Sequence, residues 1–171
     1  ESIVEEYENG NVHNKAFQDV FLTAPTGAGK SLLFQVPAIY IGEKHNALSI
    51  VVTPLKALML DQVNQLRSKA NYNKVAYINS DISIVERDEI LNDVHNGEIN
   101  ILYLAPESLL SYDISYFLGK RKSGLYVVDE AHTVTTWGRD FRVDYWYLGY
   151  HINKVRKYAK DENNKNLKFV V

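Results

Sequence analysis

The sequence predicts an α/β fold in which a mostly parallel β-sheet is covered by helices on both faces. Three observations support this prediction. Short runs rich in β-branched and aromatic residues recur along the chain, most of them are apolar almost throughout, and segments with helical spacing lie between them. Continuous apolar runs are typical of strands that are buried on both faces. Strands that alternate with helices imply crossover connections and a parallel sheet.

Each predicted strand follows from one of these runs. The four clearest strands are expected at residues 19–24, 47–53, 100–104 and 124–128. Two weaker candidates are residues 74–78 and 167–171. Because the last of these strands lies at the end of the chain, we expect the chain to be part of a longer protein.

Helices are predicted between the strands. Apolar residues recur three and four apart from Leu55 to Leu66, and less regularly from Ile84 to Val94. A helix is also expected from Leu32 onward, and Pro37 should kink or end it. Two polar segments are expected to lie in solvent. They are the loop at residues 8–15 and the basic turn at residues 119–122.

Composition limits the possible classes of protein. The 171 residues suffice for one domain with a hydrophobic core, and the net charge of −2 provides no overall attraction to nucleic acid. The absence of cysteine excludes disulfides and thiolate metal sites. No apolar run approaches the roughly 18 residues of a membrane span, and the acidic start is unlike a signal peptide. We therefore expect an intracellular protein, cytoplasmic or nuclear, with no membrane partner.

A glycine-rich turn follows the first predicted strand. Residues 24–31 read APTGAGKS and lead into the helix that starts near Leu32. This strand–turn–helix context is the one that a phosphate-binding loop requires. The backbone N–H groups of Thr26, Gly27, Ala28 and Gly29 can surround an anion at the positive end of the helix. Lys30 would reach the β- and γ-phosphates of a nucleotide, and Ser31 would bind Mg²⁺.

Two adjacent carboxylates follow the predicted strand at residues 124–128. Ligands of open α/β sheets bind at the carboxyl ends of the strands, where Asp129 and Glu130 are expected. Asp129 would hold Mg²⁺, Glu130 would orient and deprotonate water, and His132 would connect this site to other elements. Taken alone, the pair is equally consistent with an acidic helix start. The phosphate loop favours the metal-binding interpretation.

These motifs together resemble a known family. The turn and residues 129–132, DEAH, look like motifs I and II of superfamily 2 helicases, in which alanine commonly replaces the first glycine. Residues 53–63, TPLKALMLDQV, look like motif Ia of RecQ helicases, and residues 103–109, YLAPESL, look like their motif Ib. Residues 132–142, HTVTTWGRDFR, resemble the aromatic-rich loop after the RecQ DEAH box. The resemblance covers about residues 19–171.

The resemblance implies a RecA-like P-loop NTPase lobe at residues 19–171, preceded by a polar or helical lead-in at residues 1–18. It further implies ATP and Mg²⁺ as cofactors, single-stranded or duplex DNA as partner, and a second RecA-like lobe elsewhere in the full-length chain. Without that lobe we expect weak or no turnover. The RecQ loop usually carries Cys, His and Pro at the positions of Thr133, Arg139 and Val143. The adenine-reading motif 0 is not evident in residues 1–18.

The segments expected to bind DNA have structural explanations as well. Trp137 and Phe141 can stack on unpaired bases, or can anchor a long loop to the core. Arg139 and Arg142 can pair with phosphates. Thr53 and Lys56 can contact a DNA phosphate where a strand leads into a helix, although Thr53 is equally suited to capping that helix.

Three functional hypotheses follow. The favoured one is the ATP-binding lobe of a RecQ-like, ATP-dependent DNA helicase. The second is another superfamily 2 motor, an RNA helicase or a duplex DNA translocase. The third is a non-catalytic nucleotide-binding module, which the presence of Lys30, Asp129 and Glu130 disfavours.

Overall fold

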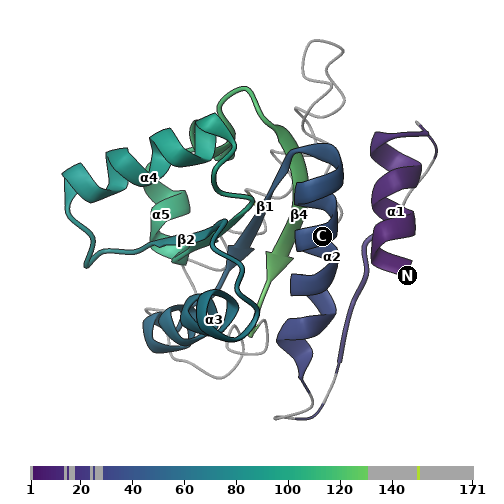
Figure 1. The fold of residues 1–171 in the computed structure, drawn as a ribbon, viewed down its shortest axis with the longest axis horizontal. Helices are drawn as coiled ribbons and strands as arrows, with labels where there is room; N and C mark the ends of the chain where they lie inside the picture. The colour runs from purple at the N-terminus through teal and green to yellow at the C-terminus, as the bar shows by residue number, and fades with distance from the viewer. Residues whose placement is uncertain are drawn as a thin grey trace.

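The computed structural model describes residues 2–13, 15, 18–23, 25, 29–130 and 150. Helices and strands alternate along most of this part of the chain (Figure 1). In chain order the elements are α1 (Ser2–Asn11), α2 (Lys30–His45), β1 (Ala47–Val52), α3 (Lys56–Lys69), β2 (Val75–Ile78), α4 (Ile84–Asn96), β3 (Ile101–Leu104), α5 (Pro106–Ser111), α6 (Ile114–Leu118) and β4 (Lys122–Val128).

The strands form one parallel sheet in the order β2-β3-β1-β4. Every residue of β1 is buried, which explains why that run is apolar throughout. Leu48, Ile50 and Val52 pack on one face with residues of α4, α5 and α6. Ala47 and Val51 pack on the other face with residues of α1, α2 and α3. The predicted α/β class, with helices on both faces of a parallel sheet, is therefore confirmed.

The first predicted strand is wrong for the described residues. Residues 18–23 form neither helix nor strand, and Phe21 is 84% exposed. An apolar run becomes a buried strand only when a neighbouring strand accepts its backbone hydrogen bonds and helices cover it. Residues 18–23 have no such partner strand among the described residues. The predicted strand at residues 167–171 lies outside the described part of the chain.

Three local predictions also need correction. Helix α2 continues through Pro37 to His45, because Phe34, Ala38 and Ile41 pack it against the sheet on either side of the proline. The expected loop at residues 8–15 begins later, since α1 extends to Asn11. The basic turn is not solvated throughout: Arg121 is only 7% exposed, because its guanidinium group binds acceptors at the amino ends of the strands.

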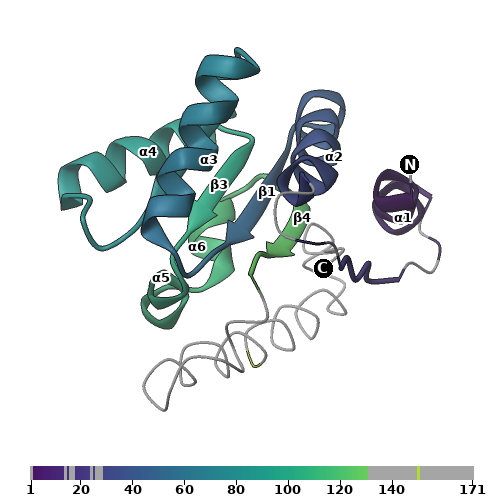
Figure 2. The ribbon, with the colours of Figure 1, turned by 90° about the horizontal axis from the view of Figure 1, so that it is seen from below.

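Helix α1 packs beside α2 on the side away from the strands, as Figures 1 and 2 both show. Its anchor is Tyr7, which is 1% exposed and belongs to the same apolar cluster as α2 and α3. The ring of Tyr7 also lies 5.5 Å from the ring of His45, centroid to centroid. Tyr7 thus packs α1 into the same core as α2 and α3.

One buried and one partly buried tyrosine predict a loss of stability at alkaline pH. Burial raises the pKa of Tyr7 and Tyr72 from 10.0 to about 12. Below pH 10 both hydroxyls stay protonated in the folded and unfolded chains, so their contribution is fully present. Above pH 10 the unfolded chain ionises first, so the free energy of unfolding should fall as the pH approaches about 12. Urea unfolding followed by circular dichroism across this range measures the loss.

Tyr7→Phe is the control for this prediction, because it keeps the buried ring and removes the ionisable hydroxyl. The variant should lose stability less steeply between pH 10 and pH 12 than the wild type. An equal slope in the two proteins would contradict the assignment to Tyr7.

Candidate nucleotide site at the carboxyl edge of the sheet

Helix α2 begins at a glycine that no ordinary side chain can easily replace. Gly29 is the N-cap residue and has φ of 72° and ψ of 29°, in the left-handed region that glycine favours. No side chain caps the helix, and the first two helical residues are Lys30 and Ser31, both half-buried. An uncapped helix start presents free N–H groups and a positive dipole end, which suit a phosphate.

The predicted carboxylates lie directly after β4. The backbone N–H of Asp129 donates to the Val52 carbonyl over 2.9 Å, which extends the pairing of β4 with β1 by one residue. The chain then turns sharply, and Glu130 has a φ of 52°. A positive φ is uncommon for a residue other than glycine, and such backbone strain often occurs at functional sites.

Both oxygens of the Asp129 carboxylate have partners within the chain. Oδ1 accepts a hydrogen bond from the backbone N–H of Glu130 over 2.9 Å. Oδ2 accepts one from the side-chain Nε2 of Gln62, in α3, over 3.0 Å. These two contacts fix the carboxylate at the tip of β4.

Topology brings the start of α2 and the end of β4 to the same edge of the sheet. Only Asn46 separates α2 from β1, so the helix runs antiparallel to the strands. The 16 residues of α2 span about 24 Å, and the 6 residues of β1 span about 20 Å. The start of α2 therefore lies near the level of the strands' carboxyl ends, toward the lower end of Figure 1.

A buried contact shows which side of α2 faces the end of β3. Ser31 and Gln35 lie four residues apart and share one face of the helix. Gln35 donates from Nε2 to the Tyr103 hydroxyl over 2.9 Å, at the end of β3. Burial, and secondarily the charge of Asp129, raises the pKa of Tyr103. Ser31 is thus on the side of α2 that faces Tyr103.

These residues fit a magnesium–nucleotide complex. The helix start is uncapped, and Lys30 makes no ion pair with a described residue. The hydroxyl of Ser31 and the carboxylate of Asp129 belong to segments that begin and end at the same edge of the sheet. The described residues contain no cluster of three or more His, Cys, Asp or Glu side chains that could hold a metal alone. Mg²⁺ is usually bound by one or two protein ligands, and phosphate and water oxygens complete its coordination. The residues at this edge match that pattern.

The candidate DNA-binding residues at the start of α3 lie in two different environments. Thr53 is 0% exposed, and its Oγ1 has no hydrogen-bond partner among the described residues. Its hydroxyl therefore has no surface for a DNA phosphate in this conformation, contrary to the expectation for that side chain. Lys56 is accessible, and its Nζ lies 2.7 Å from Asp81 Oδ1, in the loop that follows β2.

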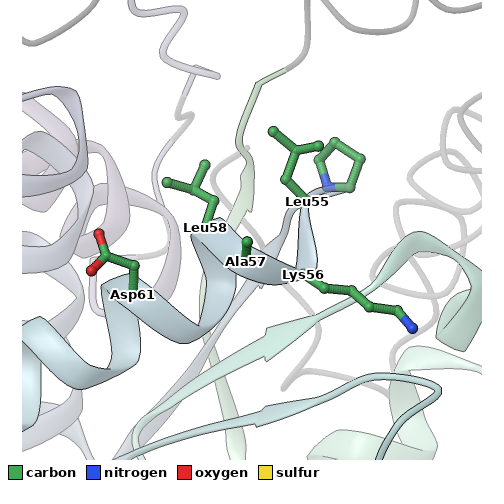
Figure 3. A pocket seen from close by; sticks show the side chains of 6 residues that line it. Leu55, Lys56, Ala57, Leu58 and Asp61 are labelled. Carbon is green, nitrogen blue, oxygen red and sulfur yellow. The ribbon is translucent and has the colours of Figure 1, made fainter.

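The first turn of α3 also borders a pocket of about 620 Å³. Figure 3 shows the side chains of Lys56 and Asp61 pointing in opposite directions from α3. The other lining residues are Pro54, Leu55, Ala57 and Leu58. This surface lies at the same edge as Asp129, because α3 follows the carboxyl end of β1.

Several predicted site residues lie outside the described part of the chain. They are Thr26, Gly27 and Ala28 of the phosphate loop, and His132, Trp137, Arg139, Phe141 and Arg142 after β4. Their roles stay predictions. Conversely, Gln35, Gln62 and Tyr103 were not predicted as site residues. A signal existed for Gln62, a polar residue at a core-facing position of the helical repeat.

In this parallel sheet, a helix that starts after a glycine and a carboxylate that follows a strand lie at one edge. This arrangement is typical of α/β domains that bind nucleoside triphosphates. Comparison with known families narrows this class. The family model for DEAD/DEAH box helicases matches residues 8–167. The chain therefore belongs to the DEAD/DEAH box helicase family.

Within that family the chain is similar to RecQ-type proteins. It is 41% identical over 141 residues to ATP-dependent DNA helicase Q5 of Rattus norvegicus, covering 79% of this chain and 14% of that protein. It is 34% identical over 132 residues to ATP-dependent DNA helicase RecQ of Haemophilus influenzae, covering 77% and 20%. It is 40% identical over 135 residues to the probable ATP-dependent DNA helicase RecS of Bacillus subtilis, covering 77% and 25%.

The chain thus spans a quarter or less of the length of these three relatives. Among the described residues, no helix is both long enough and apolar enough to cross a membrane.

Proposed function

We propose that the chain is the ATP-binding lobe of a RecQ-like, ATP-dependent DNA helicase. The observation that supports this most is the shared edge at which the glycine-led start of α2 and the carboxylate of Asp129 lie. Similarity to proteins named as ATP-dependent DNA helicases supports DNA as the polymer. We place the lobe at residues 19–171, with residues 1–18 as a lead-in, and we place the protein inside the cell, where DNA is found.

The proposed nucleotide site uses both sides of this edge. When bound, ATP supplies the anhydride bond whose hydrolysis drives movement, and Mg²⁺ neutralises part of the phosphate charge. The backbone of the phosphate loop, Lys30 and the α2 dipole bind the phosphates, and Ser31 and Asp129 would hold the metal. Glu130 orients the attacking water and accepts its proton, and His132 connects this site to the DNA-binding loop. The loop residues are Thr26, Gly27, Ala28 and Gly29.

The proposed DNA contacts are on two segments of the chain, the start of α3 and the loop after the DEAH box. Lys56 contributes a positive charge at the start of α3, where it is accessible. The loop after the DEAH box contributes two flat rings for base stacking and two guanidinium groups for phosphates. These four residues are Trp137, Phe141, Arg139 and Arg142. A second lobe of the full-length protein would complete both sites.

A nucleic-acid-stimulated ATPase assay of the full-length protein tests the proposal against the two other hypotheses. Single-stranded DNA should stimulate turnover and RNA should not, and a forked DNA duplex should be unwound. Stimulation by RNA or by duplex alone would favour another superfamily 2 motor. Nucleotide binding without any turnover would favour a non-catalytic module.

The Lys56–Asp81 ion pair leads to a prediction about DNA affinity. Both side chains are well exposed, so the pair contributes at most about 1 kcal/mol and a DNA phosphate competes with Asp81 for Lys56. Asp81→Asn should therefore tighten binding of single-stranded DNA about two- to five-fold. Lys56→Ala should weaken binding and lower the salt slope by about 1. Fluorescence anisotropy of a labelled oligonucleotide across a salt series measures both effects.

Lys74→Ala is the matched control for this measurement. Lys74 is similarly exposed and pairs with Glu43 over 3.3 Å, but it precedes β2 at the opposite edge of the sheet. Its loss should leave the salt slope unchanged. If Lys56→Ala and Lys74→Ala behave alike, Lys56 is not a specific phosphate contact.

A further inference from the structure

Gln62 is a polar side chain on the core-facing side of α3. It is 4% exposed, and its neighbours on that side of the helix are Met59, Val63 and Leu66, all buried. Burying an amide costs free energy unless it is hydrogen-bonded. The partner of Gln62 is the Asp129 carboxylate, 3.0 Å from its Nε2, at the tip of β4. The packing of α3 thus directs this amide toward the proposed metal ligand.

The contact leaves Asp129 little freedom to rotate. Gln62 holds Oδ2 through a side chain of α3, and the Glu130 backbone holds Oδ1. The second contact comes from the neighbouring residue and turns with the chain. Among the described residues, Gln62 is therefore the one that joins the carboxylate to a different element. The carbonyl oxygen of Gln62 is also buried and has no hydrogen-bond partner among the described residues. The bond to Asp129 is therefore the hydrogen bond that the Gln62 amide makes among the described residues.

Helix α3 joins this contact to the accessible start of the helix. Lys56 is its first residue and Gln62 lies six residues later, about 9 Å along the axis. Met59 packs the segment between them into the core, and Val63 and Leu66 pack the part of the helix that follows Gln62. A displacement of the first turn by a bound strand would move the amide of Gln62 relative to β4.

We propose that Gln62 is a positioning residue: it orients the Asp129 carboxylate for the metal and links that carboxylate to the DNA-contacting end of α3. This inference rests on the proposed function, in which Asp129 holds Mg²⁺ and Lys56 contacts DNA. The groups that orient a metal ligand commonly change metal affinity by 10- to 100-fold when they are removed.

Gln62→Met in the full-length protein tests the inference, because methionine keeps the volume of the side chain and removes the donor. Binding of a fluorescent ATP analogue is measured with Mg²⁺ and with a chelator. The gain in affinity that Mg²⁺ gives should fall by about ten-fold in the variant, while the affinity in chelator stays that of the wild type. Turnover at saturating ATP should fall, and its stimulation by single-stranded DNA should fall further.

Gln65→Met is the matched control. Gln65 lies on the same helix but binds Asp61 at the surface, over 2.6 Å. The Gln65→Met variant should retain the full gain in nucleotide affinity from Mg²⁺ and the full stimulation of turnover by single-stranded DNA. Each preparation gives its own ratio of the two affinities, so partial unfolding does not alter the result. Gln62→Leu serves as a second apolar variant.

The outcomes separate the inference from the proposed function. Wild-type protein that fails to bind the nucleotide would overturn the proposed function itself. Wild type that binds, with Gln62→Met retaining the full effect of Mg²⁺, would overturn only the role of Gln62. Failure of both Gln62 variants to fold would also overturn it, because Gln62 would then act in folding and not in positioning.

Discussion

Replacing Lys30 with alanine in the full-length protein is expected to reduce ATP turnover by about 10²- to 10³-fold. Lys30 is the first residue of α2 and follows the left-handed Gly29, at the edge where the strands end. A positive charge there stabilises the negative charge that develops on the transferred phosphoryl group. Steady-state ATPase assays with and without single-stranded DNA measure the loss.

The fold should survive this substitution. Lys30 makes no ion pair with a described residue, so its removal breaks no identified structural contact. The control is Lys44→Ala, in the last turn of the same helix, where Lys44 pairs with Glu8 over 2.8 Å. That variant should retain turnover, although it loses an ion pair. Unchanged turnover in Lys30→Ala would exclude the phosphate-loop assignment.

The sequence predicts the central strands well because their burial is a local property of composition. The runs at residues 47–53, 100–104 and 124–128 are apolar on both faces, and the structure makes each of them a strand to within two residues. The weaker run at residues 74–78 is also a strand. The same pattern fails at residues 19–24, because an apolar run cannot itself specify which strand it pairs with.

The chemistry of the site is predicted in part. Gly29, Lys30, Ser31, Asp129 and Glu130 are visible as motifs, and topology alone puts the start of α2 and the end of β4 at one edge.

Other parts of the site depend on contacts between residues far apart in the chain. The Gln62–Asp129 bond spans 67 residues, and the Gln35–Tyr103 bond spans 68. No local pattern encodes these pairings, and the burial of Thr53 likewise becomes visible only in the folded chain.

Arg121 is the clearest example of a charge whose role depends on tertiary structure. In sequence it belongs to a basic turn between Gly119 and Lys122, and a solvated turn is the natural prediction. In the structure its guanidinium group donates to four acceptors. They are the carbonyl oxygens of Val94 and Ile99 and the side-chain oxygens of Asn46 and Asn100. Burial lowers the pKa of Arg121. One side chain thus joins the segments that precede β1, β3 and β4.

Arg121→Met is therefore expected to lower the free energy of unfolding by about 3 kcal/mol. Methionine keeps an apolar stem in the space of the arginine, but it leaves three acceptors on buried residues, Val94, Ile99 and Asn100, and one on the exposed Asn46 without this donor. Arg121→Lys should recover only part of the loss, since an ammonium group cannot reproduce the fork of the guanidinium. Urea unfolding of the three proteins measures the differences. Lys120→Met is the control, because Lys120 is exposed and should change stability by less than about 0.5 kcal/mol.

Arg121→Met also tests whether the hydrogen bonds of Arg121 serve stability alone or affect the nucleotide site as well. Arg121 lies at the amino edge of the sheet, whereas Lys30 and Asp129 lie at the carboxyl edge, about 20 Å away along β1. Where Arg121→Met is still folded, its affinity for nucleotide with Mg²⁺ should equal that of the wild type, unlike that of Gln62→Met. A weakened nucleotide affinity in folded Arg121→Met would mean that the two edges are coupled through the sheet. A free energy of unfolding within about 0.5 kcal/mol of the wild type would mean that water replaces the guanidinium without cost.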